Sequence, residues 1–148
     1  MATLWQDATR QQLLDRSRHL NPDGRAGWGR FSCPQMLAHV NDALRMALGE
    51  LPTESKRLPL RYPPLKQLII YVLPFPKGAP TAPELLARVD SAVWPQELAA
   101  FEALLERFAV VPENARRPEH PAFGRLSRRA WGVLGYRHVD HHFAQFGV

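Results

Sequence analysis

Hydrophobic residues recur at three- and four-residue intervals along several long segments, a spacing typical of amphipathic α-helices. Residues 11–20 place three leucines among polar residues and end at the stop signal Asn21-Pro22-Asp23-Gly24. Residues 32–48 have a continuous apolar stripe, formed by Met36, Leu37, Val40, Ala43, Leu44 and Ala47. Residues 81–109 and 127–146 show similar spacing. The pattern therefore predicts four main helical segments.

Capping signals support these segments. Ser32 and Gln35 have the spacing of a capping box, with Pro34 in the first turn and Gly49 in the stop position. Thr81 and Glu84 repeat the capping-box spacing. We expect Trp94-Pro95 to kink or interrupt the third segment. Ser127 is expected to cap the last helix, and Gly147 is expected to end it.

The intervening segments are rich in proline, and we expect irregular chain over residues 51–64, 74–80 and 111–124. Residues 65–73 combine β-branched and aromatic residues, but no other segment offers a strand to pair with them. We therefore predict a short buried helix there. The expected fold is all-α: one domain over residues 1–148, with four roughly antiparallel helices, additional short helices and loops.

Composition excludes several classes of protein. The longest apolar stretch, residues 68–73, is far shorter than the roughly 20 residues of a membrane-spanning helix. The first ten residues lack the apolar run of a secretory signal, so we expect a cytoplasmic protein. Cys33 is the single cysteine. It stands beside a predicted helix start, where a reactive thiolate is one interpretation, and we favour a small packing residue.

The net charge of +5 permits attraction to anions but identifies no partner. The densest basic group comprises Arg116, Arg117, Arg125, Arg128 and Arg129. Aromatic residues are not interleaved with them as in a base-stacking surface, so we favour a solvated face over nucleic-acid binding.

The strongest chemical signal is a histidine group in the last predicted helix. A rotation of about 100° per residue places the polar residues of this group on one stripe with Trp131 and Leu134, whereas Asp140 faces away. These polar residues are His138, His141, His142 and Gln145.

His138 and His142 are one helical turn apart, so their imidazoles can converge on one ion. A third ligand from a facing helix would complete a half-open site, and His39 is the best-placed candidate. A second interpretation also fits the spacing: the histidines bond one another, Gln145 and buried water, or lie on a partly exposed surface. Both interpretations are open at this point.

The other histidines are weaker candidates. His19 ends a polar helix and is expected at the surface, whereas His120 stands in a loop, where a structural or solvent-facing role is expected. His141 is off the axis of the ligand pair and, with Gln145, is a candidate for orienting a ligand or binding substrate.

The sequence resembles the DinB/YfiT-like superfamily of helical-bundle metalloproteins, through His39 and the run of His138, His141 and His142. Within it, the chain is most similar to a bacterial subgroup of unassigned function. Matching runs are Trp28-Gly29, residues 36–39, residues 74–78, Thr81, residues 120–124, Trp131-Gly132 and residues 138–147. The resemblance implies a four-helix bundle, His39, His138 and His142 as ligands of nickel or zinc, and often a homodimer.

Three functions are compatible with these residues. The resemblance implies a metal-dependent thiol S-transferase that joins a low-molecular-weight thiol to a small electrophile, with metal-assisted hydrolysis as a less favoured reaction. A non-catalytic metal-binding or interaction module of the same fold is the alternative. Nucleic-acid binding through the arginine group ranks last.

Overall fold

The computed structural model describes residues 1–78 and 81–148. Over these residues the chain is helical and forms no strand, which confirms the all-α prediction. The helices are α1 (Asp7–Ser17), α2 (Cys33–Leu48), α3 (Leu65–Tyr71), α4 (Trp94–Val110) and α5 (Arg128–Gln145), with 3-10 helices η1 (Pro59–Arg61), η2 (Pro83–Leu85) and η3 (Val89–Ser91). Within the described ranges, no helix is both long enough and apolar enough to cross a bilayer.

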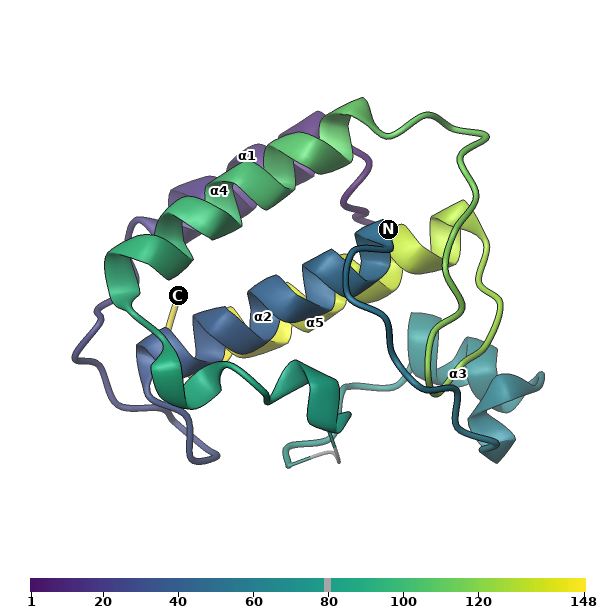
Figure 1. The fold of residues 1–148 in the computed structure, drawn as a ribbon, viewed down its shortest axis with the longest axis horizontal. Coiled ribbons are helices and arrows are strands. Elements are labelled where there is room, and N and C mark those ends of the chain that lie inside the picture. Colours follow the sequence, from purple (N-terminus) through teal and green to yellow (C-terminus); the bar gives the residue numbers. More distant parts are fainter. Residues whose placement is uncertain (79–80) are drawn as a thin grey trace.

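The four long helices share one core. In Figure 1, α2 lies in front of α5, and α4 lies in front of α1. Helix α2 contacts both α4 and α5, and α1 also contacts both of them. The apolar stripe of α2 meets α4 and α5 through fully buried side chains such as Met36, Leu37, Phe101, Leu105 and Phe143. Burial of aromatic and aliphatic side chains of this size supplies most of the stabilisation of such a core.

The predicted start and end of α2 are confirmed. The Ser32 hydroxyl accepts from the Gln35 amide and the Gln35 side chain accepts from the Ser32 amide, completing the capping box. Gly49 ends the helix in the left-handed conformation at φ 83°. Ser127 caps α5 by accepting from the Ala130 amide.

The N-terminal segment crosses α5 at two glycines. Leu4 donates a backbone hydrogen bond to the Gly132 carbonyl (3.1 Å), and a Cβ atom at Gly132 would lie 2.4 Å from the Trp5 ring. A Cβ atom at Gly135 would lie 2.5 Å from Leu4. The absence of side chains at these positions allows Leu4 to be fully buried against α5.

Some predicted boundaries are wrong. The first helix begins at Asp7 and ends at Ser17, earlier at both ends than residues 11–20. The third segment is not a helix from Thr81 onward: residues 83–91 form two 3-10 turns, and Glu84 accepts from the Glu54 amide. Val89, Asp90, Ser91 and Val93 have low helix propensity, which favours this interruption. Pro95 occupies the first turn of α4, so it begins this helix and does not kink it.

Helix α3 forms at the predicted place but is not a buried helix. Ile70 is its one buried residue, and Leu68 exposes 42% of its surface. Apolar composition alone did not distinguish a buried helix from one that packs through a single side. Residues 74–78 form the predicted loop, and the last two residues of that prediction, 79 and 80, lie outside the described residues.

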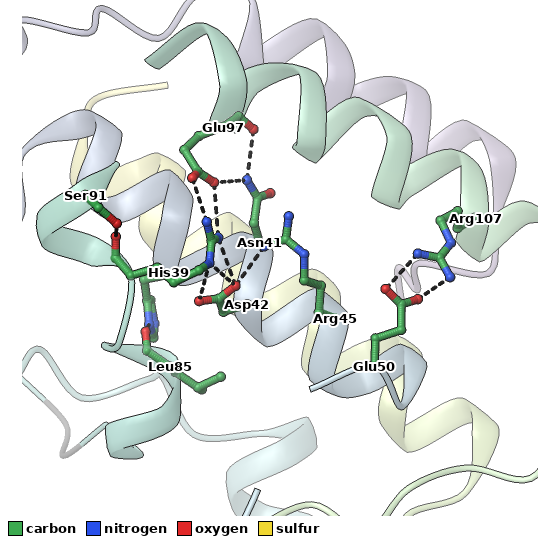
Figure 2. Close-up of polar contacts among 10 residues, drawn as sticks. His39, Asn41, Asp42, Arg45, Glu50, Leu85, Ser91, Glu97 and Arg107 are labelled. Atoms are coloured by element: carbon green, nitrogen blue, oxygen red, sulfur yellow. Dashed lines mark hydrogen bonds and ion pairs between the residues drawn. The ribbon is translucent and has the colours of Figure 1, made fainter. Parts of the chain in front are cut away.

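A buried ionic network joins α2, η3 and α4 (Figure 2). Asp42 and Glu97 are only 2% and 4% exposed. The Arg88 guanidinium lies between their carboxylates, with nitrogen–oxygen distances of 2.9 Å to Asp42 and 3.0 Å to Glu97. Arg45 also pairs with Asp42, and Asn41 donates to Glu97. Two buried carboxylates without a cation would be strongly unfavourable, so Arg88 ties the segment before α4 to α2.

Removal of the Arg88 charge is therefore expected to destabilise the fold. Arg88→Met should lower the free energy of unfolding by about 2–4 kcal/mol, because it leaves the buried Glu97 without a cation and Asp42 with Arg45 alone. The control is Arg107→Met, which removes the exposed pair with Glu50 at the far end of the same helices and should change it by less than about 1 kcal/mol. Denaturant unfolding measures both, and equal effects would contradict the assigned importance of the network.

Candidate metal centre

Three of the six histidines meet between α2 and α5. His39 comes from the buried stripe of α2, and His138 and His142 come from successive turns of α5. One nitrogen from each ring lies within 4.8 Å of the other two, which is close enough to hold a metal ion. The Nε2 atoms of His39 and His138 are 3.1 Å apart. The structure therefore brings together the three residues predicted as ligands.

The Nδ1 atom of His39 is already bonded. It lies 3.2 Å from the Leu85 carbonyl oxygen, which can only accept, so His39 carries its hydrogen on Nδ1. The neutral ring then presents a lone pair at Nε2. The turn η2 lies against α2, and its Leu85 carbonyl selects the tautomer of His39.

The tautomer of His142 is also fixed by a hydrogen bond at its Nδ1 atom. The Gln145 amide nitrogen donates to the Trp28 carbonyl at 2.6 Å, which turns its Oε1 atom toward the His142 ring. The Oε1 atom lies 2.8 Å from His142 Nδ1, so this nitrogen is the donor. This leaves the lone pair of the neutral His142 ring at Nε2, as it is for His39. Gln145, predicted as an orienting residue, does contact a predicted ligand.

Gly29 leaves room for this contact. It has φ +77°, and a Cβ atom there would lie 2.8 Å from Gln145 Nε2. The Gly27 amide also donates to the Gln145 carbonyl at 2.7 Å. The loop that contains Trp28 thus bonds both the backbone carbonyl and the side-chain amide of Gln145. Trp28 was named from the sequence only as part of a run that matches the resembling family, and the contact of its carbonyl with Gln145 was not predicted.

Burial keeps the three imidazoles neutral. It lowers the pKa of His142 to about 4, with a further contribution from His39, against the opposing hydrogen bond to Gln145. Burial and the neighbouring histidines hold the pKa of His138 well below its usual range. Burial also lowers the pKa of His39, partly offset by the Leu85 carbonyl and the charge of Asp42. Neutral imidazole is the form that binds a metal, so protons compete weakly at pH 7.

The donor set fits a divalent transition metal. Zinc–nitrogen bonds of about 2.0–2.1 Å place tetrahedral ligand nitrogens about 3.4 Å apart, close to the separation of the His39 and His138 Nε2 atoms. His39 is buried, whereas His138 and His142 keep part of their surface exposed. Three protein nitrogens leave at least one coordination position for another ligand. Nickel and zinc both accept this set.

His141 lies at the rim of the cluster. Its ring is 5.4 Å from the ring of Trp28, 5.9 Å from that of Phe75 and 5.2 Å from that of His142, measured between centroids. It contributes no nitrogen to the cluster of three. Burial lowers its pKa, as does the charge of Lys77, with Asp140 opposing. Its position suits contact with a substrate more than metal ligation.

Asp140 and Cys33 lie outside the site. Asp140 faces away from the ligands as predicted and pairs with Arg16 at 2.7 Å. Cys33 is fully buried, and burial raises the pKa of its thiol to about 11. The thiol is therefore protonated at neutral pH, which supports the packing role over that of a nucleophile. His19 is exposed, as expected.

His120 has a structural role. Its Nδ1 atom accepts from the Ala122 and Phe123 amides at 3.1 and 3.3 Å. Its ring packs at a tilt against those of Phe123 and Trp131, with centroids 4.8 and 5.3 Å apart. Burial lowers the pKa of His120 to about 4. The predicted structural role in the loop is consistent with these contacts.

The geometry thus defines an all-helical protein with a group of three convergent histidines, of which His39 is buried and His138 and His142 are partly exposed. The chain belongs to the DUF1569 family, described as proteins of unknown function, whose pattern matches residues 7–147. No curated protein and no solved structure matches the chain significantly.

The tautomers can be measured in metal-free protein. His39 and His142 should both carry hydrogen on Nδ1, because a carbonyl oxygen and an amide oxygen lie opposite these atoms. Nitrogen-15 NMR of the imidazole rings reports this directly. Gln145→Leu should release His142 and leave His39 unchanged. Hydrogen on Nε2 of both rings in the wild type would contradict the assigned arrangement.

His120 should make the stability of the fold depend on pH. The folded state keeps this ring neutral down to about pH 4, whereas the unfolded chain takes up a proton below about 6.5. Acid therefore favours the unfolded state, and about 3 kcal/mol should be lost as pH falls through this window. His120→Asn retains an acceptor for the two amides and does not titrate. Denaturant unfolding between pH 7 and 4 should show a smaller loss in the variant, and equal losses would contradict the assignment.

Proposed function

We propose that this protein binds one divalent metal ion, nickel or zinc, through His39, His138 and His142. The observation that supports this most is the convergence of lone pairs: the Nδ1 atoms of His39 and His142 both donate elsewhere, so their Nε2 atoms are acceptors. A hydrogen on His138 Nε2 could satisfy His39. The hydrogen bonds formed among the described residues include no donor for His142 Nε2, whereas a cation would satisfy all three.

We further propose that the chain is a DinB/YfiT-like four-helix bundle, formed by α1, α2, α4 and α5. The contacts of α2 and of α1 with both α4 and α5 support this arrangement. So does the placement of the histidines, since bundles of this kind build metal sites from side chains on facing helices.

The proposed reaction is thiol transfer to a small electrophile. A bound cation would lower the pKa of a thiol placed at an open coordination position. Gln145 fixes the ring of His142, and His141, with Trp28 and Phe75, forms a rim that can orient a substrate. Lys77 lies 4.4 Å from the Trp28 ring and adds positive charge near this rim, which favours an anionic thiol.

Two other functions are less favoured. Hydrolysis needs a base, and Asp140, the carboxylate nearest to His138 and His142 in the sequence, is paired with Arg16 on another face. A non-catalytic metal-binding module needs no substrate rim, and the partly exposed His138, His141 and His142 favour an accessible site.

Elemental analysis of untagged protein purified without chelators tests metal binding. The wild type should contain nearly one ion per chain, and His39→Ala and His142→Ala should each lose it, because two imidazoles bind far more weakly than three. His19→Ala, which changes an exposed histidine, should retain the metal. A wild type that stays metal-free after incubation with Ni²⁺ or Zn²⁺ would leave a hydrogen-bonded histidine cluster.

Activity requires a separate test. Consumption of a small electrophile by low-molecular-weight thiols should depend on the protein and should fall at least about 100-fold in folded His138→Ala. His141→Ala should lower turnover and retain the metal. Full metal content without thiol-dependent turnover would favour the non-catalytic module, and unchanged turnover in His138→Ala would eliminate the transferase proposal.

A further inference from the structure

An open cavity of about 460 Å³ lies in the connection between α4 and α5, at the start of α5. Its lining residues are Arg116, Arg117, Pro118, Glu119, Arg125 and Leu126. This volume is within the range of small-molecule sites. His138 follows the start of α5 by ten residues, or roughly 15 Å along the helix at 1.5 Å per residue. The cavity is therefore separate from the histidine cluster.

Positive charge predominates in this cavity. Three of its lining residues are arginines, and Glu119 is the one acid among them. Both Glu119 oxygens are already paired, one with Arg61 at 3.1 Å and the other with Arg125 at 3.3 Å. These partners hold the pKa of Glu119 below its usual range. Because Arg61 brings a further charge, Glu119 does not neutralise the arginines around the cavity.

Arg117 is held in place by contacts that leave part of it unsatisfied. Its guanidinium lies 4.7 Å from the Trp5 ring, on which Arg128 also stacks at 4.0 Å. One terminal nitrogen donates to the Pro112 and Glu113 carbonyls. The Arg117 Nε atom is buried and has no hydrogen-bond partner among the described residues. Burial and the nearby charge of Arg128 lower the pKa of Arg117. An anion would offset both penalties.

We infer that this cavity binds the phosphate group of a small phosphorylated molecule. The planar guanidinium forks of Arg116, Arg117 and Arg125 match the bidentate geometry of phosphate oxygens. The cavity is larger than a phosphate ion, and Pro118 and Leu126 offer apolar surface to an organic portion. Its lining contains no aromatic residue on which nucleic-acid bases could stack. This inference does not depend on the proposed metal centre.

Isothermal titration with inorganic phosphate and with phenyl phosphate, in 0.15 M NaCl, tests the inference. Both should bind the wild type at one site. Arg116→Gln and Arg125→Gln should each weaken binding about tenfold, because each removes charge-assisted hydrogen bonds. These two residues are exposed, so the variants should remain folded. The control is Arg25→Gln, which changes an exposed arginine distant in sequence and should bind as the wild type does.

A second control excludes phosphate bound to a metal. His142→Ala should retain phosphate affinity, and loss of binding in this variant would overturn the inference. Tighter binding of phenyl phosphate than of inorganic phosphate would identify a phosphorylated metabolite as the source, and equal binding would identify free phosphate. Absent binding, or weak binding that is equal in all variants, would overturn the site. Arginine-dependent binding of RNA or DNA without competition by phosphate would overturn it in favour of a nucleic-acid surface.

Discussion

The approach of α2 to α5 at the histidines is the constraint on which the rest of the structure depends. It places a buried imidazole from one helix 3.1 Å from an imidazole of the other. Burying imidazoles is unfavourable unless both ring nitrogens have partners. The surrounding chain supplies hydrogen-bond partners for two Nδ1 atoms: the Leu85 carbonyl for His39 and the side-chain oxygen of Gln145 for His142. One nitrogen of each of the three rings is left within 4.8 Å of the other two, which is close enough to hold a metal ion.

Part of the connection between α2 and α4 lies against α2 near this approach. One of its short turns presents the carbonyl to His39, and Arg88, three residues later, neutralises Asp42 and Glu97 in the interior. Asp42 lies one turn after His39 and raises its pKa against the effect of burial. The buried charges thus hold this turn and His39 in a fixed relation. The site is supported by polar contacts on α2 as well as by apolar packing.

Much of the fold followed from local patterns. The capping box at Ser32, the stop at Gly49 and the apolar stripe of α2 were predictable because each acts within a few residues. The pair of His138 and His142 was also predictable, since helical spacing alone places them together. The carbonyls of Trp28 and Leu85 were not, because any residue provides one and only the tertiary structure selects it. The pairing of Arg88 with Asp42 and Glu97 also depends on the tertiary structure. It lies in a segment of 3-10 turns, where a helix was expected before Trp94.

X-ray absorption spectroscopy of metal-loaded protein tests the central claim most directly. It counts imidazole ligands through their characteristic multiple scattering and distinguishes nitrogen from sulfur. We expect three imidazoles at about 2.0–2.1 Å if the metal is zinc, with the remaining coordination completed by light atoms from solvent. A spectrum with sulfur from Cys33, or with fewer than three imidazoles, would contradict a site built from His39, His138 and His142.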